Sequence, residues 1–261
     1  MRRGLMLLLL LPIAAGCGAK QSGFEGSDQA LKDIGTSRVE WTIEVTDPDW
    51  VYSSVGSIDY AQQRGELVMK GKDIPGGEGR ALFIGRETYF GLDLQGKMRW
   101  QKDSYEAIGT DRFIPGPGGT DPNQLLGVLT KSSKEVEILG KEEIRGVLAT
   151  HYRAHLDERK LEQTDRFSRN ELVVDAWVDD NGLVRRVRAP YDQGVTVRVD
   201  LFDFGVPVEV DAPPADEIVS ADDFWKAVDK WCTSRSPNEE SQFCAVSAGT
   251  GVSEGEIQEG K

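Results

Sequence analysis

The chain has 261 residues, of which 39% are hydrophobic, and a formal net charge of −13 at pH 7. A chain of this length can bury a proper hydrophobic core. The excess of acidic residues argues against binding to nucleic acid and against attraction to anionic lipid headgroups, because both would be repelled.

The first residues have the features of a secretory signal peptide over residues 1–16. Arg2 and Arg3 precede a leucine-rich run, and small residues follow directly before Cys17. The apolar run is shorter than the roughly 20 residues that span a bilayer. An ordinary signal peptide followed by a stray cysteine is the alternative.

The stretch Ala14-Ala15-Gly16-Cys17 resembles a bacterial lipobox. The resemblance implies that a diacylglycerol is attached to the thiol of Cys17, that the chain is cut before it, and that its new amino group can be acylated with a fatty acid such as palmitate. We therefore expect a lipoprotein of the cell membrane that faces the extracytoplasmic side. Two or more acyl chains anchor a protein stably, whereas one does so only marginally.

A flexible tether (17–27) precedes the first elements. Ser27 or Asp28 is expected to cap a helix over 29–34 that Gly35 ends. From residue 38 the apolar residues alternate with polar ones, which is typical of a half-buried strand. Further strands are expected at 52–60, 64–70, 80–84, 88–92, 97–102, 135–139, 147–157, 172–179, 183–188 and 195–204, with a further candidate strand at 206–210.

Helices and turns interrupt this series of strands. A helix is expected after Asp121-Pro122, and the charged segment 158–170 is a candidate surface helix. Asp180-Asn181-Gly182 predicts a hairpin turn. Ala212-Pro213-Pro214 is expected to end the sheet. No domain boundary is visible, and we predict one domain over 28–219.

A terminal helix is expected within residues 220–244. Ser220 and Asp223 form a capping box, and an apolar stripe follows, made of Phe224, Trp225, Val228 and Trp231. The acidic tail (245–261) is rich in Gly, Ser and Glu and is predicted to be disordered.

Cys232 and Cys244 remain as a pair once Cys17 is assigned to the anchor. In an exported protein such a pair favours a disulfide, which would stabilise the fold by roughly 3 kcal/mol on a loop-entropy model. Their spacing is not that of a metal or redox motif.

No constellation of residues indicates catalysis, and we predict neither an enzyme nor a cofactor. His151 and His155 lie four apart in a stretch with strand character, which separates them by about 13 Å, too far to share a metal ion. The glycine-rich segment 116–119 lacks the Lys-Ser/Thr of a phosphate-binding loop.

Large apolar residues recur along the predicted strands. They pack in the core between the sheet and its helices, or some of them line a groove for an apolar ligand; both interpretations need the same residue types. The candidate groove residues are Trp41, Leu67, Met69, Phe83, Phe90, Trp100, Tyr152 and Trp177.

Several segments together resemble the LolA-like lipoproteins, in particular their actinobacterial LppX/LprG-type branch. They are GSIDYAQQRGELVM (56–69), FIGRETYFGL (83–92), DPNQLLGVL (121–129), EILGKEEIRGVLATHYRAHLD (137–157), DAWVDDNGLVRRVR (175–188) and DFGVPVEVDAPPADEIV (203–219). The resemblance implies a mainly β, α+β fold. A single curved antiparallel sheet would form a half-open barrel, with helices over its concave face and acyl chains between them.

The leading hypothesis is therefore an envelope lipoprotein that binds or carries a lipid or acylated glycolipid in an apolar groove. The alternative is a non-catalytic protein-interaction or sensory lipoprotein in which the same fold is a solid scaffold. The terminal helix (220–244) lies outside the resemblance and would be a local addition at one end of the barrel.

Overall fold

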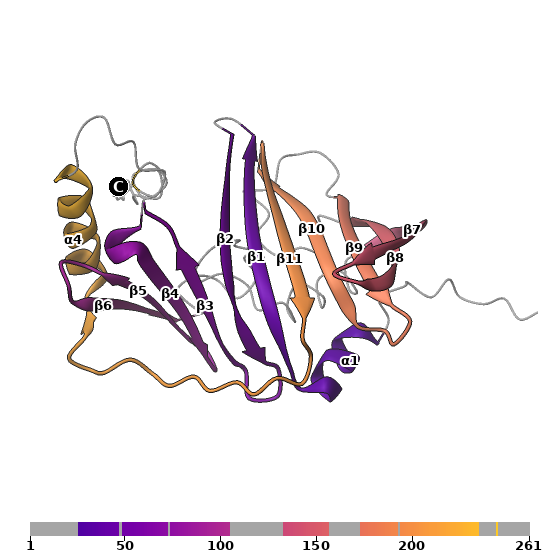
Figure 1. Cartoon of the computed structure of the whole chain (residues 1–261), viewed down its shortest axis with the longest axis horizontal. Coiled ribbons are helices and arrows are strands. Elements are labelled where there is room, and N and C mark those ends of the chain that lie inside the picture. The colour runs from indigo at the N-terminus through magenta and orange to yellow at the C-terminus, as the bar shows by residue number, and fades with distance from the viewer. Residues whose placement is uncertain are drawn as a thin grey trace, which may run out of the picture.

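The computed structural model describes residues 26–46, 49–72, 74–104, 133–156, 173–192, 194–234 and 244 (Figure 1). The predictions for the signal peptide, Cys17, most of the tether, the helix after Pro122, the segment 158–170 and the acidic tail lie outside these residues. In the described part of the chain, neither helix is long and apolar enough to span a bilayer.

Among the residues that the structure describes, twelve strands form one sheet, with the order β12-β6-β5-β4-β3-β2-β1-β11-β10-β9-β8-β7. Their bounds are β1 (Thr36–Thr46), β2 (Asp49–Asp59), β3 (Arg64–Lys70), β4 (Glu78–Ile84), β5 (Glu87–Asp93), β6 (Met98–Ser104), β7 (Ser133–Ile144), β8 (Val147–Leu156), β9 (Val173–Asp179), β10 (Val184–Asp192), β11 (Val195–Phe202) and β12 (Ile218–Val219). The other elements are α1 (Ser27–Ile34), a short 3-10 turn η1 (Pro75–Gly77) and α4 (Ala221–Thr233).

The sheet is curved and open, as the resemblance predicts. Figure 1 shows that the strand direction turns steadily from β6 through the central strands to β8, in keeping with the twist of β-sheets. Within the described residues, β12 and β7 are the two edges and do not pair with each other.

Two meanders meet in the middle of this sheet. β1 to β6 pair in chain order, and so do β7 to β11. β11 then returns to pair with β1, with Trp41 opposite Val199 and Val39 opposite Leu201. The two meanders therefore share one continuous sheet.

The predicted turn at Asp180-Asn181-Gly182 joins β9 to β10. The Asp179 carboxylate accepts hydrogen bonds from the backbone N–H groups of Asn181 at 2.8 Å and Leu183 at 3.0 Å. Gly182 has a φ of 78°, which glycine adopts at little cost. The turn is fixed by the local residues that predicted it.

The segment after β11 differs from the prediction. Residues 206–210 form no strand. Pro207 among them has no backbone N–H to donate to a neighbouring strand. Val208 and Val210 instead pack against Trp100. The sheet also continues beyond Pro213-Pro214, since β12 pairs with β6 in parallel and makes the sheet mixed rather than purely antiparallel.

α1 begins slightly earlier than predicted. Gly26, and not Ser27 or Asp28, occupies its N-cap position and makes no side-chain hydrogen bond. The helix ends at Gly35 as expected, where the Gly35 N–H donates to the Leu31 carbonyl oxygen at 3.1 Å.

α4 has the predicted capping box. The Asp223 N–H donates to Ser220 Oγ at 3.1 Å, and Ser220 Oγ donates to the Asp223 carboxylate at 2.8 Å. Phe224 and Val228 are fully buried, whereas Trp225 and Trp231 are only partly covered.

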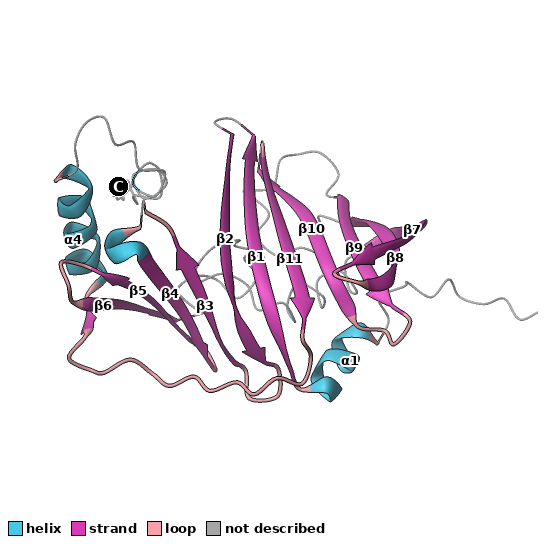
Figure 2. Cartoon of the chain, in the orientation of Figure 1, coloured by secondary structure: helices cyan, strands magenta, loops and turns pink. Residues whose placement is uncertain are grey.

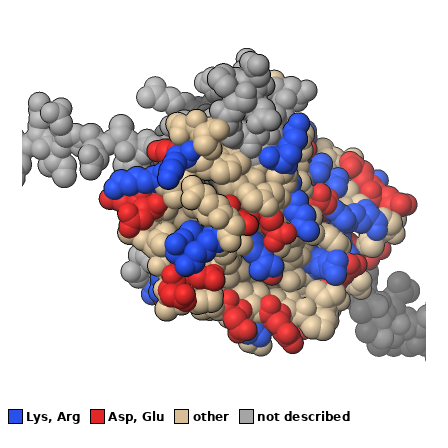
Figure 3. Space-filling view, turned by 60° about the vertical axis from the view of Figure 1, so that its left-hand side comes forward, with Lys and Arg blue, Asp and Glu red and all other residues tan. Residues whose placement is uncertain are grey.

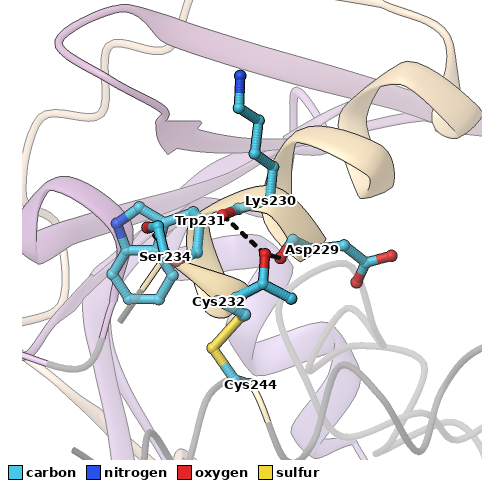
Figure 4. The surroundings of a disulfide bond; sticks show 7 residues. Asp229, Lys230, Trp231, Cys232, Ser234 and Cys244 are labelled. Carbon is cyan, nitrogen blue, oxygen red and sulfur yellow. Dashed lines mark hydrogen bonds between the residues drawn. A yellow bond between two sulfur atoms is a disulfide. The ribbon is translucent and has the colours of Figure 1, made fainter. Parts of the chain in front are cut away.

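The predicted disulfide joins Cys232 in the last turn of α4 to Cys244, with their Cα atoms 5.8 Å apart (Figure 4). Beside it, the Thr233 hydroxyl donates to the Asp229 and Lys230 carbonyl oxygens at 2.9 and 3.1 Å. The end of α4 is thus tied covalently to the chain beyond it.

The alternation of side chains gives the sheet two different faces. We call the face that carries Val39, Trp41, Leu67 and Met69 the apolar face, and the opposite one the charged face. Both described helices pack on the apolar face: Leu31 of α1 joins the cluster of Trp41, and α4 packs on Met69. Figure 2 shows the two helices near opposite ends of the sheet.

Close approach of β2 and β3 makes Gly56 irreplaceable. A Cβ atom at Gly56 would lie 1.6 Å from the Glu66 carbonyl oxygen, which belongs to the backbone and cannot move aside. We expect Gly56→Ala to lower the free energy of unfolding by about 3 kcal/mol or more. Urea denaturation measures this. The control is Gly71→Ala, whose Cβ would meet Ile74 at an ordinary 3.6 Å. Equal stability of the two variants would contradict the close approach of Gly56 to the Glu66 backbone.

Candidate functional site

The apolar face is the candidate site, and the register of the strands assembles it. Across the sheet, Phe90, Ala81, Leu67, Gly56, Val39 and Leu201 lie side by side, one residue from each successive strand. The next row runs from Leu92 through Gly79, Met69, Ser54 and Trp41 to Val199. Neither row contains a charged residue between β5 and β11, so this part of the face is apolar. In β6 the two rows continue to Gln101 and Arg99.

Large and small residues alternate along these rows. A Cβ on Gly79 would lie 2.4 Å from the Met69 methyl group and 3.1 Å from Leu92. The missing side chain of Gly79 therefore makes room for Met69. The packing of the apolar face therefore depends on small residues that leave space for large neighbours, as well as on the large residues themselves.

Six of the eight predicted groove residues lie on the apolar face. Trp41, Leu67 and Phe83 belong to its central cluster, and Phe90 and Tyr152 pack against that cluster while half-buried. Met69 lies in the neighbouring cluster with Phe224 and Val228 of α4. The position of these six residues is compatible with core packing and with a ligand groove alike.

Trp100 and Trp177 lie on the charged face, so we exclude them from the groove. Trp100 pairs with Gly91, one residue out of step with Phe90. Trp177 pairs with His151, whereas its neighbour Ala176 pairs with Tyr152. A shift of one residue along a strand moves a side chain to the other face.

Trp100 lies beneath the segment that leads to β12. Its ring fills the space left by Gly91, where a Cβ would lie 2.5 Å from the ring. Its Nε1 donates to the Glu217 carboxylate at 3.2 Å. A cavity of about 450 Å³ adjoins it, lined by both signs of charge, among them Arg80 and Glu209.

Trp177 stacks on His151 with ring centroids 4.2 Å apart. Glu142 holds both rings: Trp177 Nε1 donates to one carboxylate oxygen at 3.0 Å, and His151 Nδ1 lies 2.9 Å from the other. His151 and His155 are on a strand, as expected. Within the described ranges, no group of three or more His, Cys, Asp or Glu is arranged to hold a metal ion.

Charges on the charged face are paired with one another. Arg186 donates to both oxygens of the nearly buried Asp200, at 2.6 and 2.7 Å, and these hydrogen bonds raise the pKa of Arg186. Arg145 also contacts Asp200 and Glu40, with its guanidinium 4.0 Å from the Phe202 ring centroid. Figure 3 shows acidic and basic side chains interleaved over the side it presents, so no large patch of one sign forms there.

Two side chains on β2 join the apolar face and escaped the sequence-based list. Ser54 lies opposite Trp41, and Tyr52 lies opposite Ile43. Burial raises the pKa of the Tyr52 phenol. The alternation of Tyr52, Ser54, Gly56 and Ile58 along one strand was the signal that would have placed them together.

Trp41 places a buried indole N–H group on the apolar face. Its side chain is 2% exposed, and its Nε1–H has no hydrogen-bond acceptor in the described part of the chain. Most buried indole N–H groups have a partner.

Asp175 provides a pH-dependent test of the charged face. Burial alone would raise its pKa, but the hydrogen bonds from Arg153, together with the nearby His151 ring, outweigh burial and lower it. This carboxylate therefore stabilises the fold above its unfolded-state pKa of about 4, and the stabilisation is lost as the pH falls through the lower folded pKa. We expect Arg153→Gln to raise the pKa of Asp175 and to flatten the loss of unfolding free energy below about pH 4.

Carboxyl NMR titration and urea unfolding between pH 2 and 7 measure the two effects. Arg38→Gln is the control, because Arg38 and its partner Asp203 are both exposed and lie 3.9 Å apart. An ordinary pKa for Asp175 in the unsubstituted protein would contradict the assignment.

No protein-family model and no curated protein matches this chain. Solved structures do match. The lipoprotein LppX of Mycobacterium tuberculosis superposes with a TM-score of 0.54 and 15% identity, over 72% of this chain and 96% of LppX. LprF of Mycobacterium bovis gives a TM-score of 0.48 and 17% identity, over 74% and 96% of the two chains. A LolA superfamily protein from Nitrosomonas europaea gives 0.31 and 11%, over 74% and 94%. The likeness to LppX shows that this chain has the fold of LppX, which confirms the fold that the resemblance implied.

Proposed function

We propose that this protein is an envelope lipoprotein, anchored through Cys17, that binds or carries a lipid or acylated glycolipid on its apolar face. One observation carries the proposal. An open sheet presents uncharged residues on one face in rows that extend from β5 to β11, whereas its other face is charged. The resemblance to LolA-like lipoproteins supports the same function.

Binding would rest on desolvation and would need no chemical step. Acyl chains would leave the bilayer and lie along the rows of apolar side chains. Each methylene removed from water contributes about 0.8 kcal/mol. The anchor would keep the face close to the membrane that supplies the ligand, and no cofactor is required.

A second candidate function has an observation of its own. Ile138 and Leu148, on the edge hairpin of β7 and β8, are 70% and 53% exposed. β7 pairs only with β8 among the described strands. Exposed apolar side chains on an edge hairpin suit a protein partner, and would support a scaffold or sensory role.

Native mass spectrometry of the anchored protein, extracted from membranes, tests the lipid-binding function. We expect a non-covalent lipid mass on the unsubstituted protein and at least a tenfold loss of it in Tyr152→Glu, because a carboxylate on the apolar face would have to be buried beside acyl chains. Val173→Glu is the matched control: Val173 is also half-buried but lies on the charged face, and this variant should keep the lipid. An unsubstituted protein without any non-covalent lipid would contradict the proposal and favour the scaffold.

Cys17→Ser tests the anchor. The variant should leave the membrane fraction while its thermal unfolding, measured on the purified protein, stays unchanged. The reason is that the flexible tether is expected to separate the lipidated residue from the folded domain. Retention in the membrane fraction, or a lower melting temperature, would contradict this picture.

A further inference from the structure

The Trp41 indole holds a buried hydrogen-bond donor that the described residues leave without an acceptor. An indole N–H can only donate, and an unmade hydrogen bond costs free energy in a dry site. The two tryptophans on the charged face differ from it. Trp100 donates to Glu217 and Trp177 donates to Glu142. Of these three indoles, only that of Trp41, on the apolar face, lacks an acceptor among the described residues.

The surroundings of Trp41 limit what can meet this donor. The register places Val199 on one side of it and Ser54 on the other, with Val39 and Ile43 as its same-face neighbours on β1. None of these four side chains carries a charge. A carboxylate or phosphate at this point would be buried without a partner, which is far more costly than burying a neutral acceptor.

Two side chains with hydroxyl groups, Ser54 and Tyr52, lie near Trp41 on the apolar face. Ser54 is buried and brings a hydroxyl group next to Trp41. Tyr52 follows on the same face, and burial raises the pKa of its phenol. A ligand that crosses the face here would meet apolar surface along most of its length and hydrogen-bonding groups at one point.

We propose that Trp41 Nε1–H donates a hydrogen bond to an ester carbonyl oxygen of the bound lipid, and that the site thereby selects ester-linked acyl chains over ether-linked chains of equal length. This inference rests on the proposed lipid-binding function. An ester carbonyl is a strong, neutral acceptor that sits at one end of each acyl chain. An ether oxygen is a weaker acceptor, and a hydrocarbon has none.

Competition between two matched lipids tests the inference. The anchored protein is incubated with vesicles that contain equal amounts of dipalmitoyl phosphatidylcholine and its dihexadecyl diether analogue, which differ in the two carbonyl groups. Native mass spectrometry then gives the ratio of bound diester to diether. We expect roughly a tenfold preference for the diester, the effect of one buried hydrogen bond. Trp41→Phe keeps an aromatic ring but removes the donor and should bring the ratio close to one.

The matched control is Trp177→Phe, the same substitution on the charged face, which should keep the preference. Equal binding of diester and diether by the unsubstituted protein would overturn this inference and leave the lipid-binding function standing. Binding of neither lipid, together with no co-purified lipid, would overturn both.

A measurement without substitution guards against a Trp41→Phe variant that does not fold. In the unsubstituted protein labelled with ¹⁵N in its indoles, the Trp41 N–H resonance should move downfield when the diester is added and stay in place with the diether. The Trp100 and Trp177 resonances should not move, because their N–H groups are already bonded to carboxylates. A Trp41 resonance that the diester leaves unchanged would overturn the inference.

Discussion

The pairing of β1 with β11 is the constraint on which the rest of the structure depends. It joins strands from opposite ends of the folded domain and aligns Trp41 with Val199 and Val39 with Leu201. Without it, each meander would end in an unpaired strand edge. A slip of one residue would turn Trp41 toward the charged face and break the apolar rows. Such a long-range pairing costs much chain entropy, and β-proteins of high contact order fold slowly for this reason.

Most of the strands could be predicted because their signals are local. β3 was placed without error, and Asp180-Asn181-Gly182 specified its own turn through Asp179. The position of β11 beside β1 and the parallel pairing of β12 could not be derived in this way, since both bring together residues far apart in the chain. The resemblance to a known fold, and not periodicity, supplied the overall shape.

The candidate site was harder to predict than the sheet, because Trp100 and Trp177 lie on the face opposite to the predicted groove. Trp177 stands between Asp175 and Asp179 at spacings of two, so its charged neighbours already pointed to the polar side of the strand. The assignment of Trp177 to the groove followed its large apolar ring and not the polarity of these neighbours. Trp100 is different. By register, Arg99 and Gln101, the residues on either side of Trp100 in β6, lie on the apolar face. Local polarity would place these two polar residues on the charged face and Trp100 on the apolar face, which is the reverse of what the structure shows. Only the pairing with Gly91 settles where its ring lies.

The contrast between the two faces bears on specificity. On the charged face, many polar groups bond to one another, as in the pair of Arg186 with Asp200 and the contacts of Glu142 with Trp177 and His151. Such groups have little left to offer a ligand. On the apolar face, burial energy scales with area and treats every methylene alike, so it sets affinity without distinguishing one chain from another. A single directional donor in that setting discriminates by chemistry, because a ligand that cannot accept its hydrogen bond leaves it unpaired in a dry environment. Trp41 occupies that position in the described part of the apolar face.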